Sequence, residues 1–217
     1  MRTRTLPIMM LGMLVLVGML ALPASGSNWT AMIYLDGDNN LEYYAGVEMK
    51  EVNASDADID VLVLKDDWGT NDTHLYHVRN GTTTRLYPSW LGREANMGDG
   101  DTLAAFVNWS LSTYPANHSL LTLWDHGGSF VGCCVDSTNG SDILRIPEIR
   151  SALEDALGDG GRIDVLGFAD CLMSSVEVAS EMAPVADYMV GSEKVGWACA
   201  TEGINWDFDD IIDYMVN

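Results

Sequence analysis

A histidine and a cysteine each follow the end of an apolar segment, and together they could perform nucleophilic chemistry. His126 comes after HSLLTLW (118–124), and Cys171 comes after RIDVLGF (162–168). If these segments are parallel strands, their carboxyl ends meet at one edge of a sheet, where adjacent strands lie about 4.8 Å apart. We therefore expect the imidazole and the thiol to lie close together across neighbouring strand ends.

A cysteine in this position can become a strong nucleophile when its thiol loses a proton. Two features could lower the thiol pKa of Cys171: the imidazole of His126, and the N-terminus of a helix expected to start near Leu172. Gly127 and Gly128 follow the histidine, and a backbone N–H there could turn towards a developing oxyanion. We predict that His126 and Cys171 are catalytic, and that Gly127 and Cys171 form the oxyanion hole. Such a site is typical of acyl transfer, most simply of a peptidase.

Other interpretations of these residues have to be weighed. A lone cysteine or histidine at a strand end is more often packed in the core than catalytic. Zinc is a second alternative, and its potential ligands are His126, Cys133, Cys134 and Cys171. Adjacent cysteines rarely both bind one ion, and no C-x-x-C spacing occurs, so we predict no metal at this place.

The segment YLDGDNN (34–40) suggests two further kinds of site. The spacing of Asp36 and Asp38 is found in the nucleophile loops of phosphatases, but no well-placed downstream lysine loop accompanies it. The same alternation of side-chain oxygens is found in calcium loops. Leu41 stands where such a loop requires glycine, and Val47 where it requires the closing acid.

The elements that must position these residues alternate between strand and helix. Continuous apolar runs with helical crossovers indicate a mostly parallel sheet covered on both faces. Asn80-Gly81 predicts a tight turn, and Asp101 is expected to cap a helix. We expect strands at 29–35, 59–65, 118–124, 162–168 and 187–191, a hairpin at 74–88, and helices at 39–53, 101–114, 146–157 and 172–183.

The N-terminus has the composition of a signal peptide. Arg2 and Arg4 precede an apolar run, and small residues follow it, so residues 1–26 are expected to be removed before Ser27. Residues 27–217 fit one domain, which is expected to be C-terminally incomplete because FDDIIDYMVN (208–217) resembles a helix in mid-course. No later segment is long enough to cross a membrane.

Glycosylation sequons and charge agree with export. Asn-X-Ser/Thr occurs far more often than chance predicts, at Asn28, Asn53, Asn71, Asn80, Asn108, Asn117 and Asn139. The formal charge of −21 argues against nucleic acid as a partner and suits a solvated surface. Four cysteines are too few for a disulfide scaffold, although Cys133, Cys134 and Cys199 leave a bridge open.

Several segments together resemble the clostripain-like cysteine peptidases, in the clan that includes caspases, legumain and gingipain. They are WTAMIYLDGDNNLE (29–42), LLTLWDHGGSFVGCCVD (120–136), DVLGFADCLMSSVEVASEM (164–182) and DYMVGSEKVGWACATEGINWDF (187–208). The resemblance implies a caspase-like three-layer α/β sandwich, with His126 as general acid/base, Cys171 as nucleophile and the Gly127 N–H in the oxyanion hole. It also implies cleavage after Arg or Lys, and calcium is the only cofactor it suggests.

One departure from the family pattern concerns the substrate pocket. The family usually has Asp-Ala-Cys, whereas this chain has Ala169-Asp170-Cys171. A shift of one residue along a strand turns a side chain to the opposite face. The acids that could still supply charge to a pocket are Asp170, Glu193, Glu202 and Asp207.

The sequence therefore predicts an exported cysteine endopeptidase that acts on peptides or proteins through a thioester acyl-enzyme. No membrane contact is expected after removal of the signal peptide, and the sequence does not indicate an oligomeric state. An inactive, peptidase-like surface or binding module is the alternative, suggested by the exchanged acid and the short C-terminus.

Overall fold

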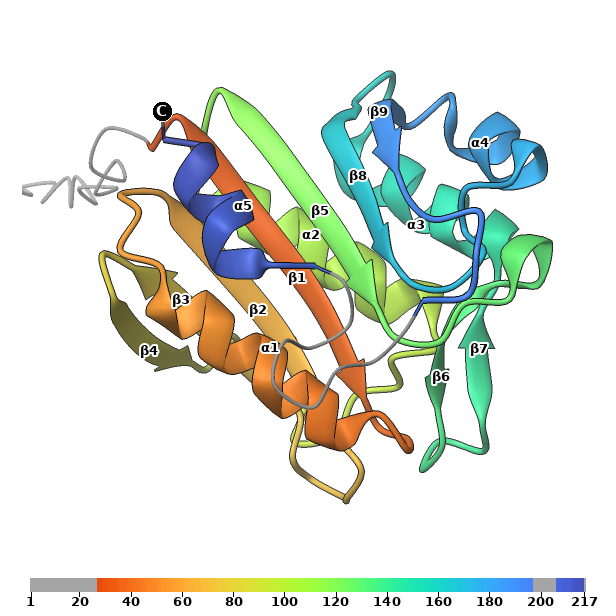
Figure 1. Cartoon of the computed structure of the whole chain (residues 1–217), viewed down its shortest axis with the longest axis horizontal. Helices are drawn as coiled ribbons and strands as arrows, with labels where there is room; N and C mark the ends of the chain where they lie inside the picture. The colour runs from red at the N-terminus through yellow and green to blue at the C-terminus, as the bar shows by residue number, and fades with distance from the viewer. Residues whose placement is uncertain (1–26, 197–205, 217) are drawn as a thin grey trace, which may run out of the picture.

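The computed structural model describes residues 27–196 and 206–216, which form a seven-stranded sheet with helices on both faces (Figure 1). The strands occur in the order β4-β3-β2-β1-β5-β8-β9. Neighbours from β2 to β9 run parallel, while β3 and β4 form an antiparallel hairpin at one edge. The strands are β1 (Trp29–Gly37), β2 (Asp60–Asp67), β3 (His74–Arg79), β4 (Thr82–Leu86), β5 (His118–Trp124), β8 (Ile163–Ala169) and β9 (Ala186–Val190).

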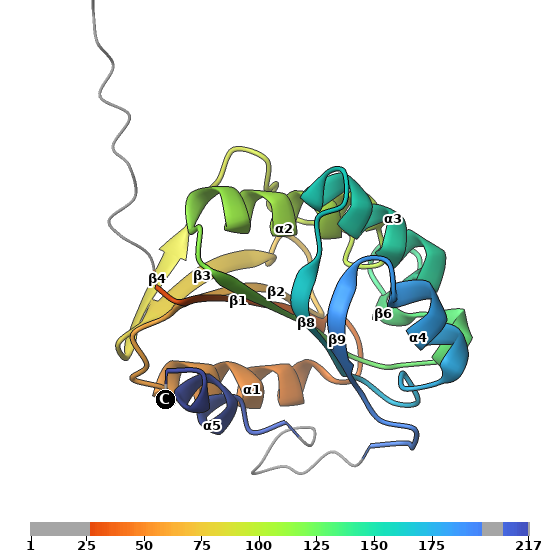
Figure 2. The same ribbon diagram turned by 90° about the horizontal axis from the view of Figure 1, so that it is seen from above.

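The helices form two outer layers (Figure 2). On one face lie α1 (Glu42–Ala54) and α5 (Phe208–Tyr214). On the other face lie α2 (Gly100–Thr113), α3 (Ile146–Leu157) and α4 (Val176–Met182). The mostly parallel three-layer α/β architecture expected from the sequence is therefore confirmed.

Strand β1 shows why the central segments are apolar at every position. Successive side chains of a strand point to opposite faces, so a strand covered on both sides must be apolar throughout. Met32 and Tyr34 pack in the core beneath α2 and α3, whereas Ile33 and Leu35 pack beneath α1 and α5. All four side chains are fully buried.

A small hairpin beside the carboxyl edge of the sheet was not expected from the sequence. It pairs β6 (Cys133–Asp136) with β7 (Asp142–Leu144), and a short 3-10 turn (Ser129–Val131) precedes it. Its strands are too short for a clear alternating pattern. The hairpin carries the two buried cysteines, Cys133 and Cys134, towards the ends of β1 and β5.

Three predicted helix starts differ from the structure, and α1 begins at Glu42 rather than at Asn39. The N-cap of α2 is Asp99, whose side chain accepts a hydrogen bond from the Asp101 N–H, so Asp101 is not the cap. Helix α4 begins at Val176 after the N-cap Ser175, four residues later than expected. Leu172 cannot lie in that helix because its φ of 66° is in the left-handed region.

The glycosylation hypothesis requires the asparagines of the sequons to lie on the surface. Every asparagine of the seven sequons is exposed. Within the described ranges, no helix has the length and apolar character needed to cross a membrane. The expected signal peptide (1–26) and Cys199 lie outside the described residues.

Candidate active site

The ends of β5 and β8 bring His126 and Cys171 to the same edge of the sheet. The two strands are parallel neighbours, and Trp124 pairs with Ala169 at their ends. His126 and Cys171 each lie two residues beyond this pair, so the chain leaves both strands in register. The Asp125 N–H also donates a 2.6 Å hydrogen bond to Asp170 Oδ1, which ties the two segments together.

Gly127 lies against the backbone of the cysteine. A Cβ atom built on Gly127 would overlap the carbonyl oxygen of Cys171 and lie 2.9 Å from its amide nitrogen and 2.8 Å from Asp170 Cβ. Real Cβ atoms essentially never approach other atoms this closely, so only glycine fits here. The residue that follows the histidine is thus in contact with the cysteine itself.

One ring nitrogen of His126 is held by an asparagine on the neighbouring loop. His126 Nε2 lies 3.0 Å from Asn40 Oδ1, and Asn40 follows β1. When Nε2–H donates this bond, Nδ1 keeps its lone pair and can accept a proton. The sequence interpretation missed Asn40 in this role, because its distance from His126 along the chain gives no local signal.

Partial burial lowers the pKa of His126 below its ordinary value. Desolvation disfavours the charged imidazolium, so the neutral ring is the dominant form at neutral pH. A neutral imidazole is suited to act as a general base.

Cys171 is a free, partly buried thiol, and its sulfur accepts a 3.2 Å hydrogen bond from the Gly196 N–H. The prediction that a helix begins directly after Cys171 is wrong, because α4 begins only at Val176. Instead, the Leu172 N–H donates to Lys194 O at 3.1 Å, and this contact holds the turn after the cysteine.

Two backbone donors near the thiol are free to bind an oxyanion. Among the described residues, neither the Gly127 N–H nor the Cys171 N–H has a hydrogen-bond partner. They belong to two segments in direct contact. The pair that the sequence analysis nominated therefore retains its hydrogen-bonding capacity.

A buried hydrogen-bond network lies next to His126. Asn39 Nδ2 donates to Asp125 Oδ1 at 2.8 Å and to Val135 O at 3.0 Å, and Asp125 Oδ2 accepts from the Val135 N–H at 2.5 Å. Burial raises the pKa of Asp125 to about 7. The network connects β1, β5 and β6 immediately beside His126.

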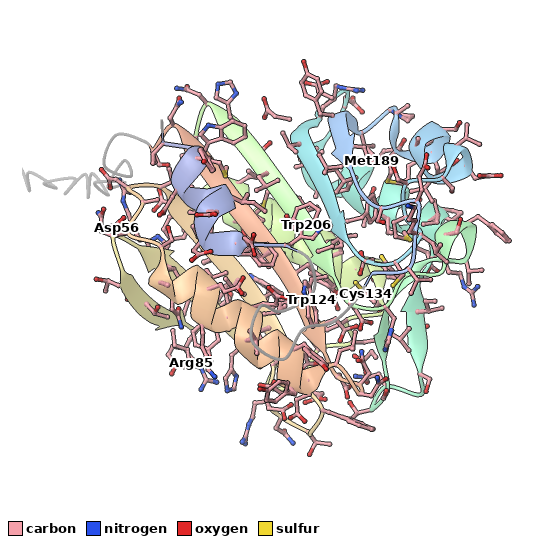
Figure 3. The ribbon with its side chains drawn as sticks, viewed as in Figure 1. Asp56, Arg85, Trp124, Cys134, Met189 and Trp206 are labelled. Carbon is pink, nitrogen blue, oxygen red and sulfur yellow. The ribbon has the colours of Figure 1, made fainter. Side chains whose placement is uncertain are left out.

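A pocket of about 680 Å³ opens beside the cysteine, between the ends of β8 and β9 and helix α5. Trp206 lies over the sheet (Figure 3), where its ring packs above Gly167. Acids, a lysine and aromatic rings share the lining, which includes Asp170, Lys194, Trp206, Asp207, Asp210 and Tyr214.

The four acids nominated for the pocket have different positions. Asp207 lines the pocket and is exposed, and Asp210, which was not nominated, accompanies it. Asp170 also lines it, but one oxygen is bound to the Asp125 N–H, and burial raises the pKa of Asp170 well above its ordinary value. Glu193 is exposed and is not part of the lining, and Glu202 lies outside the described residues.

Cys133 and Cys134 are buried free thiols. Burial raises the pKa of Cys134 well above its ordinary value, which keeps that thiol protonated. Where the structure describes the chain, the groups of side chains that could hold a metal contain only carboxylates, and neither His126 nor a cysteine belongs to them.

Comparisons with known proteins agree with this geometry. A model of the clostripain family of C11 peptidases matches residues 33–216. Clostripain from Hathewaya histolytica is 29% identical over 228 residues, which cover 85% of this chain and 41% of that protein. The chain thus spans about two fifths of the length of this curated relative.

Solved structures with the same fold are C11 proteases. A secreted C11 cysteine protease from Bacteroides thetaiotaomicron, in complex with an irreversible peptide inhibitor, superposes with a TM-score of 0.70 at 22% identity, covering 88% of this chain and 54% of that one. An inactive zymogen C11 protease from Parabacteroides distasonis gives a TM-score of 0.69 at 22% identity, covering 90% and 56%. This likeness shows the caspase-like fold.

Proposed function

This chain belongs to the clostripain family, and from that premise we propose that it is a cysteine endopeptidase in which His126 and Cys171 hydrolyse peptide bonds. The observation that carries the proposal is the shared register of β5 and β8, from which both residues emerge at neighbouring positions. The free thiol, the held imidazole and the two unbound N–H groups support the same assignment.

Acylation begins with proton transfer from the thiol. His126 Nδ1 takes the proton of Cys171 Sγ, and the thiolate attacks the carbonyl carbon of the scissile bond. The carbonyl oxygen becomes an oxyanion, which accepts hydrogen bonds from the N–H groups of Gly127 and Cys171. As the intermediate collapses, the C–N bond breaks, and His126 gives its proton to the leaving amine.

Deacylation reverses these roles with water. His126 removes a proton from a water molecule, and the resulting hydroxide attacks the thioester carbonyl carbon. The oxyanion again lies between the two N–H groups. The C–S bond then breaks, the carboxylic acid leaves, and Cys171 recovers its proton from the imidazolium.

The pH dependence of hydrolysis should reflect the lowered pKa of the partly buried His126. Because burial lowers the pKa of His126, the imidazole stays neutral, and able to accept a proton, to a lower pH than an exposed histidine. We expect the acid limb of the kcat/KM profile to have an apparent pKa below about 6.5. The measurement is kcat/KM for a reporter peptide from pH 4.5 to 8, and an acid limb centred above pH 7 would contradict the assignment of His126 as the base.

The pocket beside Cys171 favours a basic side chain next to the scissile bond. Asp207 and Asp210 offer exposed carboxylates, while the Trp206 ring can pack along an aliphatic stem or beneath a cation. Asp170 is less suited to bind a cation, because one of its oxygens is bound to the Asp125 N–H and burial raises the pKa of its carboxyl. We infer that cleavage after Arg or Lys depends on the acids of α5 rather than on the acid beside the nucleophile.

Removing these two charges should weaken binding of basic substrates. For the double variant Asp207→Asn/Asp210→Asn, we expect KM for an Arg reporter peptide to rise about fivefold, with a small change in kcat, because a half-exposed ion pair contributes about 1 kcal/mol. Asp207 makes no side-chain capping bond to α5, so asparagine there should not perturb the helix. The measurement is steady-state kinetics with Arg, Lys and Leu reporters.

Asp209→Asn is the matched control, because it removes an acid from the same helix outside the pocket lining. It should leave KM for the Arg reporter unchanged. Equal hydrolysis of Arg and Leu reporters by the parent protein would refute the basic preference. A parent protein that hydrolyses no reporter at all would favour the inactive binding module.

Export is part of the same proposal. It is supported by the basic start and apolar run within residues 1–26 and by the exposure of every sequon asparagine. Peptides or proteins outside the cell would then be the substrates.

A further inference from the structure

A second pocket, of about 660 Å³, opens between the start of β3, the end of β4 and the loop that follows β4. His74, the first residue of β3, pairs with Lys65 near the end of β2, so this end of the hairpin lies at the carboxyl edge of the sheet. His126 and Cys171 lie at the same edge. The volume is within the range of ligand sites, about 300–1,000 Å³.

The lining of this pocket is basic, although the chain as a whole is acidic. The formal charge of the chain is −21, yet among the described residues the lining contains Arg85, Arg93 and His74 and no acid. We call it the basic pocket. The apolar part of its lining consists of Leu75, Leu86, Pro88 and Leu91.

Within the described ranges, no acid forms an ion pair with either arginine of the basic pocket. The ion pairs found there are made by other basic side chains, those of Lys65, His77, Arg79, His118, Arg150 and Arg162. Glu94 follows Arg93 directly, but its carboxylate has other partners. It accepts hydrogen bonds from the Thr138 hydroxyl at 3.0 Å and from the Asp72 N–H at 3.4 Å. Both guanidinium groups are therefore available to an anionic ligand.

Two neighbours hold the guanidinium group of Arg85 in place. Its Nη2 lies 2.8 Å from His74 Nδ1, and its Cζ lies 5.1 Å from the centroid of the Tyr87 ring, a cation–π distance. Arginine has five N–H donors, so one such bond leaves enough of them to bind a carboxylate through two parallel hydrogen bonds. A group that is already oriented loses less conformational entropy when a ligand binds.

We propose that the basic pocket binds an acidic segment of a peptide. Guanidinium groups suit carboxylates, while the apolar lining and the exposed Tyr87 ring suit the aliphatic stems of acidic side chains and the residues between them. A single inorganic anion would leave most of the 660 Å³ unfilled. The charge of −21 disfavours a nucleic acid.

The order of the strands indicates on which side of the scissile bond such a segment would lie (Figure 1). In the proposed mechanism, His126 gives its proton to the leaving amine, so the substrate chain after the scissile bond starts beside β5. The pocket beside Cys171 lies on the opposite side, at the ends of β8 and β9. From β5, the sheet continues through β1 and β2 to β3 and β4.

The distance along this edge fits an extended peptide. Three to four strand spacings of about 4.8 Å, which is about 14–19 Å, separate β5 from β3 and β4. At about 3.3 Å per residue, an extended chain covers this distance in about four to six residues. We therefore place the acids about four to six residues after the scissile bond. This placement rests on the proposed function, whereas binding of an acidic peptide does not.

Peptide binding can be measured on the full chain carrying Cys171→Ala, which should not cleave the probe. Asn71, a sequon asparagine, also lines the basic pocket, so the protein is produced without N-glycans. The probes are a rhodamine-labelled hexapeptide in which glutamate alternates with serine, and the same hexapeptide with glutamine in place of glutamate. By fluorescence anisotropy, we expect the acidic probe to bind at least about tenfold more tightly than the glutamine probe.

The variants Arg93→Gln and Arg85→Gln test the two guanidinium groups. Each should weaken binding of the acidic probe about fivefold and leave binding of the glutamine probe unchanged. Lys50→Gln is the matched control, because Lys50 is exposed on α1, outside the lining, and forms no ion pair with a described residue. It removes the same charge and should bind the acidic probe as the parent does.

Three binding results would overturn the proposal: equal affinity for the two probes, full affinity in both arginine variants, or an equal loss in Lys50→Gln. Competition separates a peptide from a small anion. Sodium phosphate at about 1 mM should not displace the acidic probe more than sodium chloride of the same ionic strength does. Selective displacement by phosphate would show a site for small anions and overturn the assignment to a peptide.

Kinetics of the active protein test the placement in a substrate. A reporter peptide with glutamates at the fourth to sixth positions after the scissile bond should have a kcat/KM about fivefold above that of its glutamine counterpart, and Arg93→Gln should remove most of this difference. A reporter with a dye as the leaving group should not respond to Arg93→Gln. Equal kcat/KM for the two long reporters would refute the placement. Selective binding of the acidic probe by a chain that hydrolyses no reporter would support the basic pocket while the proposed function fails.

Discussion

Replacing Cys171 with alanine should abolish peptide-bond hydrolysis, with kcat/KM falling at least about 10⁴-fold. The reason is that Sγ forms, in the proposed mechanism, the bond that carries the acyl group, and the other described thiols, Cys133 and Cys134, are fully buried. The fold should be retained. Sγ accepts one hydrogen bond, from the partly buried Gly196 N–H, and its loss costs about 1 kcal/mol. The measurements are reporter hydrolysis and thermal unfolding of the parent and variant proteins.

Two companion variants make this result specific. Cys171→Ser keeps a hydroxyl in the same place and should be almost as inactive, because serine lacks the acidity of a thiol. Ser174→Ala, three residues along the same turn, should hydrolyse the reporter at the parent rate. If purified Cys171→Ala cleaves the reporter as fast as the parent does, Cys171 is not the nucleophile.

The placement of His126 and Cys171 at one edge could be predicted because it depends on strand topology alone. Continuous apolar runs indicate strands buried on both faces, and parallel strands end at one edge. His126 and Cys171 follow such runs directly, and the observed pairing of Trp124 with Ala169 aligns them. No side-chain contact had to be known to reach this placement.

The turn after the nucleophile could not be predicted, because its conformation depends on a remote segment. The sequence from Leu172 has helical periodicity, yet Leu172 takes a left-handed φ and its N–H binds Lys194 O. A contact between residues so distant in sequence leaves no local pattern. The helix therefore begins later, at Val176, after the N-cap Ser175, whose side chain accepts from the Val178 N–H.

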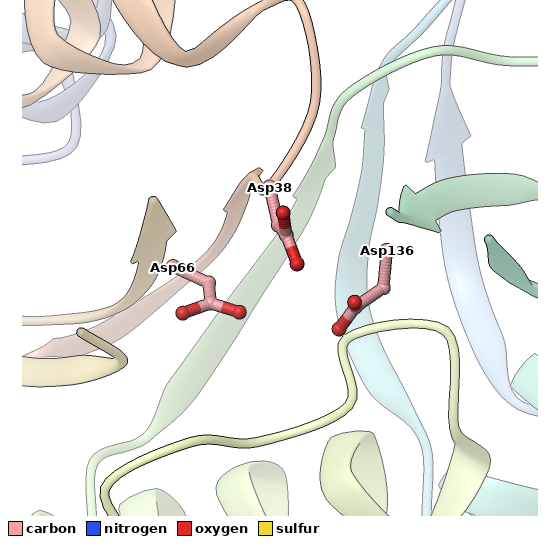
Figure 4. Close-up of side chains that lie close together, drawn as sticks. All are labelled: Asp38, Asp66 and Asp136. Atoms are coloured by element: carbon pink, nitrogen blue, oxygen red, sulfur yellow. The ribbon is translucent and has the colours of Figure 1, made fainter. Parts of the chain in front are cut away.

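A cluster of three buried carboxylates could not be predicted from the sequence for the same reason, because its members are far apart along the chain. Asp36 and Asp38 were considered for a calcium loop of contiguous ligands, a pattern that Leu41 and Val47 do not fit. The structure instead brings the buried carboxylates of Asp38, Asp66 and Asp136 together from three segments (Figure 4). Spacing rules detect groups of residues within one loop, whereas this cluster depends on how β1, β2 and β6 pack.

The pocket beside Cys171 could be predicted only in part. The exchanged order at Ala169-Asp170 suggested that Asp170 would turn away from the pocket, yet Asp170 lines it, buried and with one oxygen bound to the Asp125 N–H. Asp207 was nominated and does line the pocket, but Asp210 was missed. Only the packing of α5 against the sheet brings both acids to the same opening.

Substituting Gly127 with alanine should inactivate the protein although it removes no functional group. The added Cβ would overlap Cys171 O and lie 2.9 Å from Cys171 N, and these are backbone atoms that cannot rotate away. The loop carrying His126 must therefore separate from the cysteine. A displacement of about 1 Å between reacting groups costs about 10²-fold in rate, and overpacking costs about 1–3 kcal/mol of stability. Reporter kinetics and thermal unfolding would measure both effects.

Gly128→Ala is the matched control, because the same methyl group one residue later meets only ordinary contacts. Its Cβ would lie 3.4 Å from Val131 Cβ and 3.5 Å from Gly132 O, and the backbone φ of −123° suits alanine. This variant should keep kcat within about threefold of the parent. If Gly127→Ala were equally active, the close approach of its chain to Cys171 could not be what aligns the imidazole with the thiol. If instead the loss in Gly127→Ala is confined to kcat while the fold remains, the contact between these two backbones sets the geometry of the reaction.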